Sequence, residues 1–261
     1  MEMKVKIDIQ NLYKHYDNDD KRAKDAPTKN VLTDLNIQIR AHEFVCVLGK
    51  SGCGKSTLLN LLAGYIKPDK GAIMVDGEKI TGAGKNRGVV FQEHALFPWL
   101  TVEQNIGFGP KVCKKTKEQI KSICQKYMAM VGLEKYKDYY PDQLSGGMKQ
   151  RVGIARAFAN EAAILLMDEP FSALDNFTRE MMQTELLNIW EKSMTTIVFI
   201  THSIEEAVFL ADRVIVLGQG NVLADTKINL ERKRDVYDPK FIEYVNEFNH
   251  LIEQQRNQEE A

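Results

Sequence analysis

The stretch GKSGCGKST, from Gly49 to Thr57, has the residue types and spacing of a phosphate-binding loop. It fits the pattern G-x-x-x-x-G-K-[ST], follows the apolar run FVCVL and opens the helix-like stretch TLLNLLAG. In such a loop backbone N–H groups converge on phosphate oxygens, Lys55 reaches the outer phosphates and Ser56 ligates Mg²⁺ through its hydroxyl. The alternative is a glycine-rich turn with an exposed lysine. The predicted contacts are Gly49, Ser51, Gly52, Cys53, Gly54, Lys55, Ser56 and Thr57.

A second group of reactive side chains ends the apolar run AILLMDEP. A strand there would deliver Asp168 and Glu169 to the edge of a sheet. We predict that Asp168 orients Mg²⁺, directly or through water, and that Glu169 polarises the water that attacks a γ-phosphate. Taken alone, an Asp-Glu-Pro run also ends a strand and starts a turn. Beside a phosphate-binding loop we favour the catalytic interpretation.

The stretch LSGGMKQR, from Leu144 to Arg151, puts a serine and two glycines in front of a predicted helix. The free N–H groups and the positive end of the helix dipole favour an anion there. Ser145, Gly146 and Gly147 are therefore predicted phosphate contacts. The alternative is that Ser145 only caps the helix, which is a common role of serine.

Three apolar runs, at 44–49, 163–170 and 196–203, read as strands buried on both faces. An open parallel sheet places its ligand site at the carboxyl ends of its strands, so the polar residues that end these runs should gather there. Alternating apolar residues at 5–9 and 35–39 instead predict half-buried antiparallel strands. The charged segment between them, DNDDKRAKDAPTKN, is expected to be a solvated hairpin excursion.

Helical periodicity dominates between Gln92 and Glu161. The clearest predicted helix opens at Thr116 and stops at Gly132. A second predicted helix starts at Asp238 and Pro239, and its apolar face should dock back onto the domain. The middle of the chain is thus expected to be a helical insert, and its end a helical tail.

The composition limits which kinds of partner and compartment suit the chain. Lys and Arg total 35 against 36 Asp and Glu, a formal net charge of −1, so no overall basic field attracts nucleic acid or anionic lipid. The chain shows neither an apolar leader nor an apolar run near the ~18 residues of a membrane span, and we expect a soluble cytosolic chain. Its four cysteines lack metal-ligand spacing and suit reduced thiols; at Cys53 both a small tolerated side chain and an oxidation switch fit the sequence.

With these motifs together, the chain resembles the ATP-binding cassette (ABC) family of transporter ATPases over nearly its full length. LSGGMKQR resembles the family's signature, with Met148 where glutamine is commoner. FQEHALFPWLTVEQN resembles its glutamine loop at Gln92, SALD its D-loop ending at Asp175, and THS its switch histidine, His202. The resemblance implies an α/β fold: a P-loop NTPase (RecA-like) core with a mainly parallel sheet, an N-terminal antiparallel β subdomain and an inserted α-helical subdomain.

The expected boundaries are 1–92 and 161–228 for the nucleotide-binding core with the β subdomain, 93–160 for the helical subdomain with the signature, and 229–261 for the tail.

The family also implies roles for single residues. The implied catalytic residues are Lys55, Gln92, Glu169 and His202, and the implied Mg²⁺ ligands are Ser56, Gln92 and Asp168. His202 would hold the attacking water in register; the alternative is a turn residue before a helix capped by the box SIEE. Tyr16 would stack on adenine, and Tyr13 is close enough to compete for that role.

In this family two cassettes face each other head to tail, so that each ATP is held by one subunit's phosphate loop and by the signature of the other. The implied cofactors are ATP and Mg²⁺. The implied partners are a second ATPase subunit in a homodimer, integral-membrane permease subunits and, indirectly, an extracytoplasmic solute-binding protein, without nucleic acid. The chain would lie peripherally on the cytoplasmic side of the membrane.

LFPWLTVEQNI and the ERKRD stretch with its short helical tail resemble the cassettes of nitrate, sulfonate and taurine importers. Two features depart from that pattern. His42 stands where relatives often have glycine, and ERKRD lacks the expected prolines.

Two other functions compete with transport. A soluble cassette ATPase of DNA repair would carry a long coiled coil between Gln92 and the signature, and one of translation would carry two cassettes in one chain; neither feature is in the sequence. A non-catalytic binding module would lack Glu169 or Lys55, and both are present.

Overall fold

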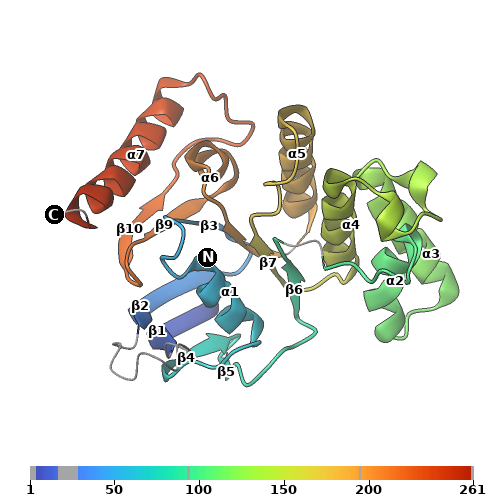
Figure 1. Cartoon of the computed structure of the whole chain (residues 1–261), viewed down its shortest axis with the longest axis horizontal. Helices are drawn as coiled ribbons and strands as arrows, with labels where there is room; N and C mark the ends of the chain where they lie inside the picture. The colour runs from blue at the N-terminus through green and yellow to red at the C-terminus, as the bar shows by residue number, and fades with distance from the viewer. Residues whose placement is uncertain (1–3, 17–28, 93–94, 194, 260–261) are drawn as a thin grey trace, which may run out of the picture. The chain divides into compact units, whose positions relative to one another are not determined.

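The computed structural model describes residues 4–16, 29–92, 95–193 and 195–259 (Figure 1). The chain divides into two compact units. The first comprises Met1–Gly84 and Thr196–Ala261, and the second comprises Lys85–Thr195. The subdomain boundaries expected from the sequence follow motifs rather than contacts, and they stay predictions.

An antiparallel sheet with the strand order β2-β1-β4-β5 begins the first unit. Its strands are β1 (Val5–Tyr16), β2 (Lys29–Arg40), β4 (Lys70–Val75) and β5 (Glu78–Lys79). Ile7 pairs with Ile39 and Ile9 with Ile37, and all four side chains are buried. Paired residues share one face of a sheet, so the alternation turns a single apolar face to the core. The predicted antiparallel strands are confirmed; positions 17–28 of the predicted excursion lie outside the described residues.

The second sheet of this unit carries two of the predicted site loops. Its strands are β3 (Phe44–Leu48), β8 (Thr196–Ile200), β9 (Arg213–Leu217) and β10 (Val222–Lys227). β3 pairs in parallel with both β8 and β9, and β10 pairs antiparallel with β9. All residues of β3 and β8 are buried, as their apolar runs predict. Because β3 and β8 run parallel, the loops that follow them leave the sheet at the same edge.

The helices of the first unit are α1 (Lys55–Ala63), α6 (Ile204–Leu210) and α7 (Pro239–Glu259). α7 starts at the predicted Pro239 and buries Phe241 and Phe248. α6 and α7 contact each other, which confirms that the tail docks (Figure 1).

The turn between β2 and β3 explains His42. Its φ of 64° lies in the left-handed region that favours glycine, and its N–H donates to Thr196 Oγ1 at 3.0 Å. Histidine is therefore a turn variant at a position whose backbone suits glycine.

The second unit pairs two parallel strands with helices. The strands are β6 (Arg87–Val90) and β7 (Ile164–Asp168), and the helices are α2 (Val102–Val112), α3 (Lys117–Met130), η1 (Glu134–Tyr136), η2 (Pro141–Gln143), α4 (Gly146–Ala159) and α5 (Asn176–Lys192). α2, α3 and α4 pack on one another. Thr116 caps α3 through a capping box with Gln119, and Gly132 follows with φ 64°, so the predicted helix limits are confirmed. Over the described ranges, no helix has both the length and the apolar composition needed to cross a membrane.

Candidate active site

The phosphate-binding loop of the first unit closes around the Lys55 side chain. Lys55 is only 7% exposed, and its ammonium donates to the carbonyl oxygens of Gly49 at 2.6 Å and Lys50 at 2.8 Å. The Cys53 sulfur is buried and lies 4.0 Å from the same ammonium. These contacts fix a cation inside the loop. The burial of Cys53 favours the interpretation of a small packed side chain over that of an oxidation switch.

Glycines suit this loop because its backbone has positive φ angles and, at Gly54, leaves no room for a side chain. A Cβ on Gly54, whose φ is 105°, would lie 2.7 Å from Leu32 Cδ2 and 2.8 Å from the Val31 carbonyl oxygen. Gly52 also has a positive φ, but a Cβ there would meet nothing within 4 Å among the described atoms. The loop is therefore packed tightly against β2 on one side and open on the other, where an anion can approach the backbone.

The first turn of α1 is prepared for an anion. Gly54 occupies its N-cap position; no side chain of the described protein caps this end, and no acidic residue lies in the first turn. The free N–H groups and the helix dipole therefore favour a phosphate at this position. Ser51 and Ser56 are exposed beside it and Thr57 is half-buried, so the hydroxyl that the motif assigns to Mg²⁺ is accessible.

Two tyrosines of β1 are candidates for the adenine contact. Tyr16 is 45% exposed, with the Lys14 ammonium 5.5 Å from its ring centre. Tyr13 is half-buried, with the Lys70 ammonium 5.8 Å from its ring centre. Stacking requires an accessible ring face, and the more exposed Tyr16 offers more of it.

His202 lies between β8 and α6 and is exposed. The next residue, Ser203, caps α6 by accepting from the Glu206 N–H at 3.2 Å, and its own N–H donates to Thr201 Oγ1 at 3.0 Å. A capped helix therefore does follow the histidine, as the alternative of a simple turn residue predicted. His202 follows β8 at the same edge of the sheet as the phosphate-binding loop, so its position is also compatible with the role that the resemblance implies.

In the second unit β7 ends on Asp168, and Glu169 follows directly. Both carboxylates are half-buried, and Gln92 Nε2 lies 3.5 Å from Glu169 Oε2. Glu169 has a φ of 44°, a conformation that costs a residue with a side chain about 1–3 kcal/mol and is found most often at functional sites. Gln92, Asp168 and Glu169, all predicted site residues, thus lie together at the end of β7. Gln92 and Glu169 are 77 positions apart in the chain. A partly exposed carboxylate beside an amide can accept a proton from water.

The signature forms the start of α4. Ser145 is the N-cap, and its hydroxyl accepts from the Met148 N–H at 3.3 Å. Ser145 and Gly146 are exposed. The capping role predicted as the alternative is therefore present in this structure, and the exposed N–H end of α4 remains compatible with an anion.

The SALD stretch packs against this helix start. A Cβ on Gly147 would lie 3.2 Å from Leu174 Cδ2, which places the D-loop beside the signature. Asp175 caps α5 by accepting from the Thr178 N–H at 3.0 Å, and hydrogen bonds from Thr178 hold the pKa of Asp175 below its usual value.

Sequence reasoning missed two residues that support these loops. Arg179 donates to the carbonyl oxygens of Leu174 at 2.9 Å and Phe171 at 3.4 Å, and so holds the SALD stretch. Gln150 is 1% exposed and donates to the Phe91 carbonyl oxygen at 3.4 Å, next to Gln92. A sequence signal existed for both, since Arg179 lies one helical turn after Asp175 and Gln150 lies inside the signature.

The predicted residues thus fall into two sets. The first unit holds Tyr16, the loop from Gly49 to Thr57, and His202; the second unit holds Gln92, Ser145, Gly146, Gly147, Asp168, Glu169 and Asp175.

Comparison with known proteins agrees with these motifs. The family model described as ABC transporter matches residues 32–172, more than half of the chain. The uncharacterized ABC transporter ATP-binding protein MJ0412 of Methanocaldococcus jannaschii is 47% identical, over 93% of this chain and 89% of its own. The nitrate import ATP-binding protein NrtD of Synechocystis is 44% identical, over 87% and 90%. The aliphatic sulfonates import ATP-binding protein SsuB of Bacillus thuringiensis is 46% identical, over 75% and 76%.

Among solved structures, the ATP-binding cassette MJ0796, in a dimeric post-hydrolysis state bound to ADP and Pi, matches with a TM-score of 0.77 and 32% identity. The match covers 86% of this chain and all of that one. The predicted α/β cassette fold is confirmed. Motifs, fold and relatives agree, and the chain belongs to the ABC transporter family, in which it is an ATP-binding subunit and an ATPase.

Proposed function

We propose that this ATPase drives an importer, with the chain working as a dimer on the cytoplasmic face of a membrane permease. The observation that carries the hydrolytic part is the meeting of Gln92 and Glu169 at the end of β7, 3.5 Å apart. Relatives named for nitrate and aliphatic sulfonate import support the direction of transport.

The proposed residue roles are those that the family resemblance implies, and the contacts described above are compatible with them. Lys55 and the N–H groups of α1 hold the β- and γ-phosphates, and Tyr16 stacks on adenine. Glu169 accepts the proton of the attacking water, and His202 holds that water in register.

Each of the three residues proposed to hold Mg²⁺ carries an oxygen donor that suits the ion. Ser56 offers an exposed hydroxyl, Asp168 a half-buried carboxylate and Gln92 an exposed amide, and hard oxygen ligands of this kind suit the ion. When bound, Mg²⁺ neutralises charge that develops on the transferred phosphoryl group.

A second copy of the chain would complete each site. The N-terminal end of α4 is exposed and carries Ser145 and Gly146 at its tip, which suits the N–H groups to a phosphate held by another subunit. The dimeric state of MJ0796 supports this arrangement.

A groove of about 590 Å³ in the second unit is the proposed permease contact. Trp99 and Phe108 line it, 70% and 40% exposed, and both rings lie within 6 Å of the Phe97 ring centre. An exposed aromatic patch of this kind marks a protein interaction site. Phe97 and Trp99 lie inside the FQEHALFPWLTVEQN stretch, so the permease would bind at the glutamine loop.

The transported solute would be nitrate, a sulfonate, taurine or a related small solute. Isolating the intact complex from its native membrane tests the proposal: a permease and a solute-binding protein should copurify. Ligand screening of that binding protein would then identify the solute. Recovery of the chain with ribosomes or DNA instead, without a permease, would favour a soluble cassette ATPase.

Glu169→Gln tests the hydrolytic part separately. It preserves shape but removes the base, so hydrolysis should fall by about 10²–10⁴-fold while ATP still binds and holds the dimer closed. Light scattering with Mg-ATP should show a stable dimer. Glu180→Gln, at an exposed position of α5, is the matched control and should behave as wild type. Unchanged hydrolysis in Glu169→Gln would exclude Glu169 as the base.

A further inference from the structure

The carboxyl end of α6 is held by the segment that precedes the C-terminal helix. α6 has seven residues, from Ile204 to Leu210, and Ala211 is its C-cap. The last four carbonyl groups of a helix have no partner within the helix and must find donors elsewhere. In α6 these are the carbonyls of residues 208–211.

Two arginines of the ERKRD stretch supply those donors. Arg234 Nη1 donates to the carbonyl oxygens of Val208, Phe209 and Ala211, the last at 2.7 Å. Arg232 Nη1 donates to the remaining one, on Leu210. All four carbonyls therefore lie within hydrogen-bond distance of a guanidinium nitrogen, although the two N–H groups of Arg234 Nη1 are shared among three of them. Two positive charges thus lie at the negative end of the helix dipole.

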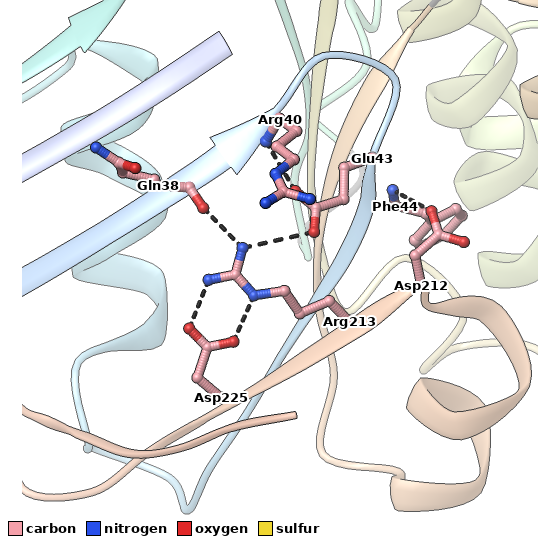
Figure 2. Close-up of polar contacts among 7 residues, drawn as sticks. All are labelled: Gln38, Arg40, Glu43, Phe44, Asp212, Arg213 and Asp225. Atoms are coloured by element: carbon pink, nitrogen blue, oxygen red, sulfur yellow. Dashed lines mark hydrogen bonds and ion pairs between the residues drawn. The ribbon is translucent and has the colours of Figure 1, made fainter. Parts of the chain in front are cut away.

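Other residues of the first unit hold both arginines in place. Arg232 pairs with Asp212. The other carboxylate oxygen of Asp212 accepts from the Phe44 N–H at 2.9 Å (Figure 2). Arg234 is 8% exposed and donates to the Leu230 carbonyl oxygen from its other terminal nitrogen. Burial, together with the neighbouring Arg232, lowers the pKa of Arg234 to about 10, so it stays protonated near neutral pH.

The helical tail adds to this anchor. α7 packs on α6 and buries Phe241 and Phe248. The Tyr244 hydroxyl accepts from the Asn229 N–H at 3.2 Å and donates to the Lys227 carbonyl oxygen at 3.4 Å, which ties α7 to the segment before it.

The other end of α6 begins directly after His202. A helix of seven residues is about 10 Å long and too short to bend, so a displacement at one end is transmitted to the other. Ser203 caps the first turn, and its N–H is bonded to Thr201 Oγ1, which joins the histidine turn to the helix.

We propose that Arg232 and Arg234 are positioning residues for ATP hydrolysis, which act by fixing α6 and through it His202. Loss of these contacts should therefore slow hydrolysis without changing ATP binding. The proposal rests on the role proposed above for His202. In place of the prolines that the resemblance led us to expect, guanidinium contacts hold the ERKRD stretch.

The test is a double-mutant cycle in the full chain with Arg234→Ala and His202→Ala, measured as single-turnover hydrolysis of Mg-ATP at saturating nucleotide. Arg234→Ala alone should slow hydrolysis about tenfold, since a small displacement of a catalytic group is costly, and leave the Kd for ATP unchanged. In the His202→Ala background Arg234→Ala should have no further effect.

Arg213→Ala is the matched control. Arg213 is a half-buried arginine of the first unit, and its guanidinium holds Asp225, Glu43 and the Gln38 carbonyl oxygen instead of α6 (Figure 2). This variant should lower Tm and leave the hydrolysis rate of the folded protein unchanged. If Arg213→Ala slows hydrolysis as much as Arg234→Ala, the effect is one of general stability and the proposal is wrong.

Two further outcomes separate this proposal from the proposed function. If His202→Ala slows hydrolysis and the losses of the two variants multiply, the arginine does not act through the histidine, and only the positioning proposal fails. If His202→Ala hydrolyses at the wild-type rate, the proposed function loses its histidine and the positioning proposal fails with it. Should Arg234→Ala not fold, Arg232→Gln at the half-buried neighbouring site enters the same cycle, with the same lack of additivity expected.

Discussion

Two helices of this chain begin beside glycines, α1 in the first unit and α4 in the second, and their first turns differ in construction. α1 starts after Gly54, which no side chain of the described residues caps, and a Cβ at this glycine would collide with Val31 and Leu32. α4 starts after Ser145, whose hydroxyl already accepts the Met148 N–H.

The difference shows how the two ends can be used. At the end of α1 none of the described side chains caps the N–H groups, and the Lys55 ammonium lies inside the same loop, so this end has the features of a phosphate site on its own. The end of α4 has one donor satisfied internally, and it tolerates being without a ligand. We infer that the first end binds ATP in a single subunit and that the second contributes only when another subunit brings a nucleotide to it.

The largest expected effect concerns the α1 site. Lys55→Ala removes the cation fixed inside the loop, in a buried environment where charge-assisted contacts are strong, so the Kd for ATP should rise about 100-fold or more. Isothermal calorimetry checks this. Lys67→Ala, an exposed lysine shortly after α1, removes the same charge and should bind ATP normally. If Lys55→Ala binds ATP with unchanged affinity, Lys55 is not part of the phosphate site, and the proposed difference between the starts of α1 and α4 is wrong.

A pair of heterodimers tests whether α4 serves the other subunit. In the first, one subunit carries Lys55→Ala and the other Ser145→Arg; in the second, both lesions lie in one subunit opposite a wild-type partner. If sites are shared between subunits, the first heterodimer keeps one intact site, whereas the second has both sites damaged. We expect the first to be at least about tenfold faster, because Ser145→Arg puts a bulky cation where the N–H groups should meet phosphate.

Single-turnover hydrolysis on differentially tagged, doubly purified heterodimers is the measurement, because one working site still registers there. A faster second heterodimer would mean that Ser145 serves the phosphate of its own chain. In that case α1 and α4 would act in one subunit, contrary to the comparison.

A smaller effect on ATP affinity tests whether the first unit also supplies the adenine contact. Tyr16→Ala should weaken ATP binding about fivefold, since aromatic stacking contributes about 1 kcal/mol, and Tyr13→Ala should leave it unchanged. Calorimetry on both variants decides between them. The opposite ranking would assign the adenine contact to the half-buried Tyr13.

Much of this arrangement was predictable from the sequence, because the signals lie in short stretches of consecutive residues. β3 and β8 are continuous apolar runs, α3 opens with a capping box at Thr116, and Gly52 and Gly54 of the loop before α1 adopt a positive φ. Each of these signals lies within a few consecutive residues, where the chain's own geometry decides the outcome.

The missed contacts are those between distant segments. Gln150 reaches back 59 residues to the Phe91 carbonyl, and Arg234 reaches back 26 residues to that of Val208. Both side chains donate to main-chain carbonyls, which every residue possesses, so no partner residue type marks the contact in the sequence. Basic side chains in ERKRD look like a solvated charge run until the fold brings the end of α6 to them.

The smallest expected effect asks whether Ser145 does more than cap α4. Ser145→Ala removes the hydroxyl that accepts the Met148 N–H, and loss of an N-cap costs about 1 kcal/mol, or a Tm lower by about 2–4 °C in a protein of this size. Thr116→Ala is the matched control, since it removes the cap of α3 in the same unit and should lower Tm by a similar amount. The two variants should differ in hydrolysis: only Ser145→Ala should slow single-turnover ATP hydrolysis by the dimer, by a few-fold, because one hydrogen bond to phosphate is lost while the N–H groups of Gly146 and Gly147 remain. If the variants match in hydrolysis as well as in Tm, the hydroxyl of Ser145 is a cap alone, and any phosphate contact of α4 belongs to its backbone.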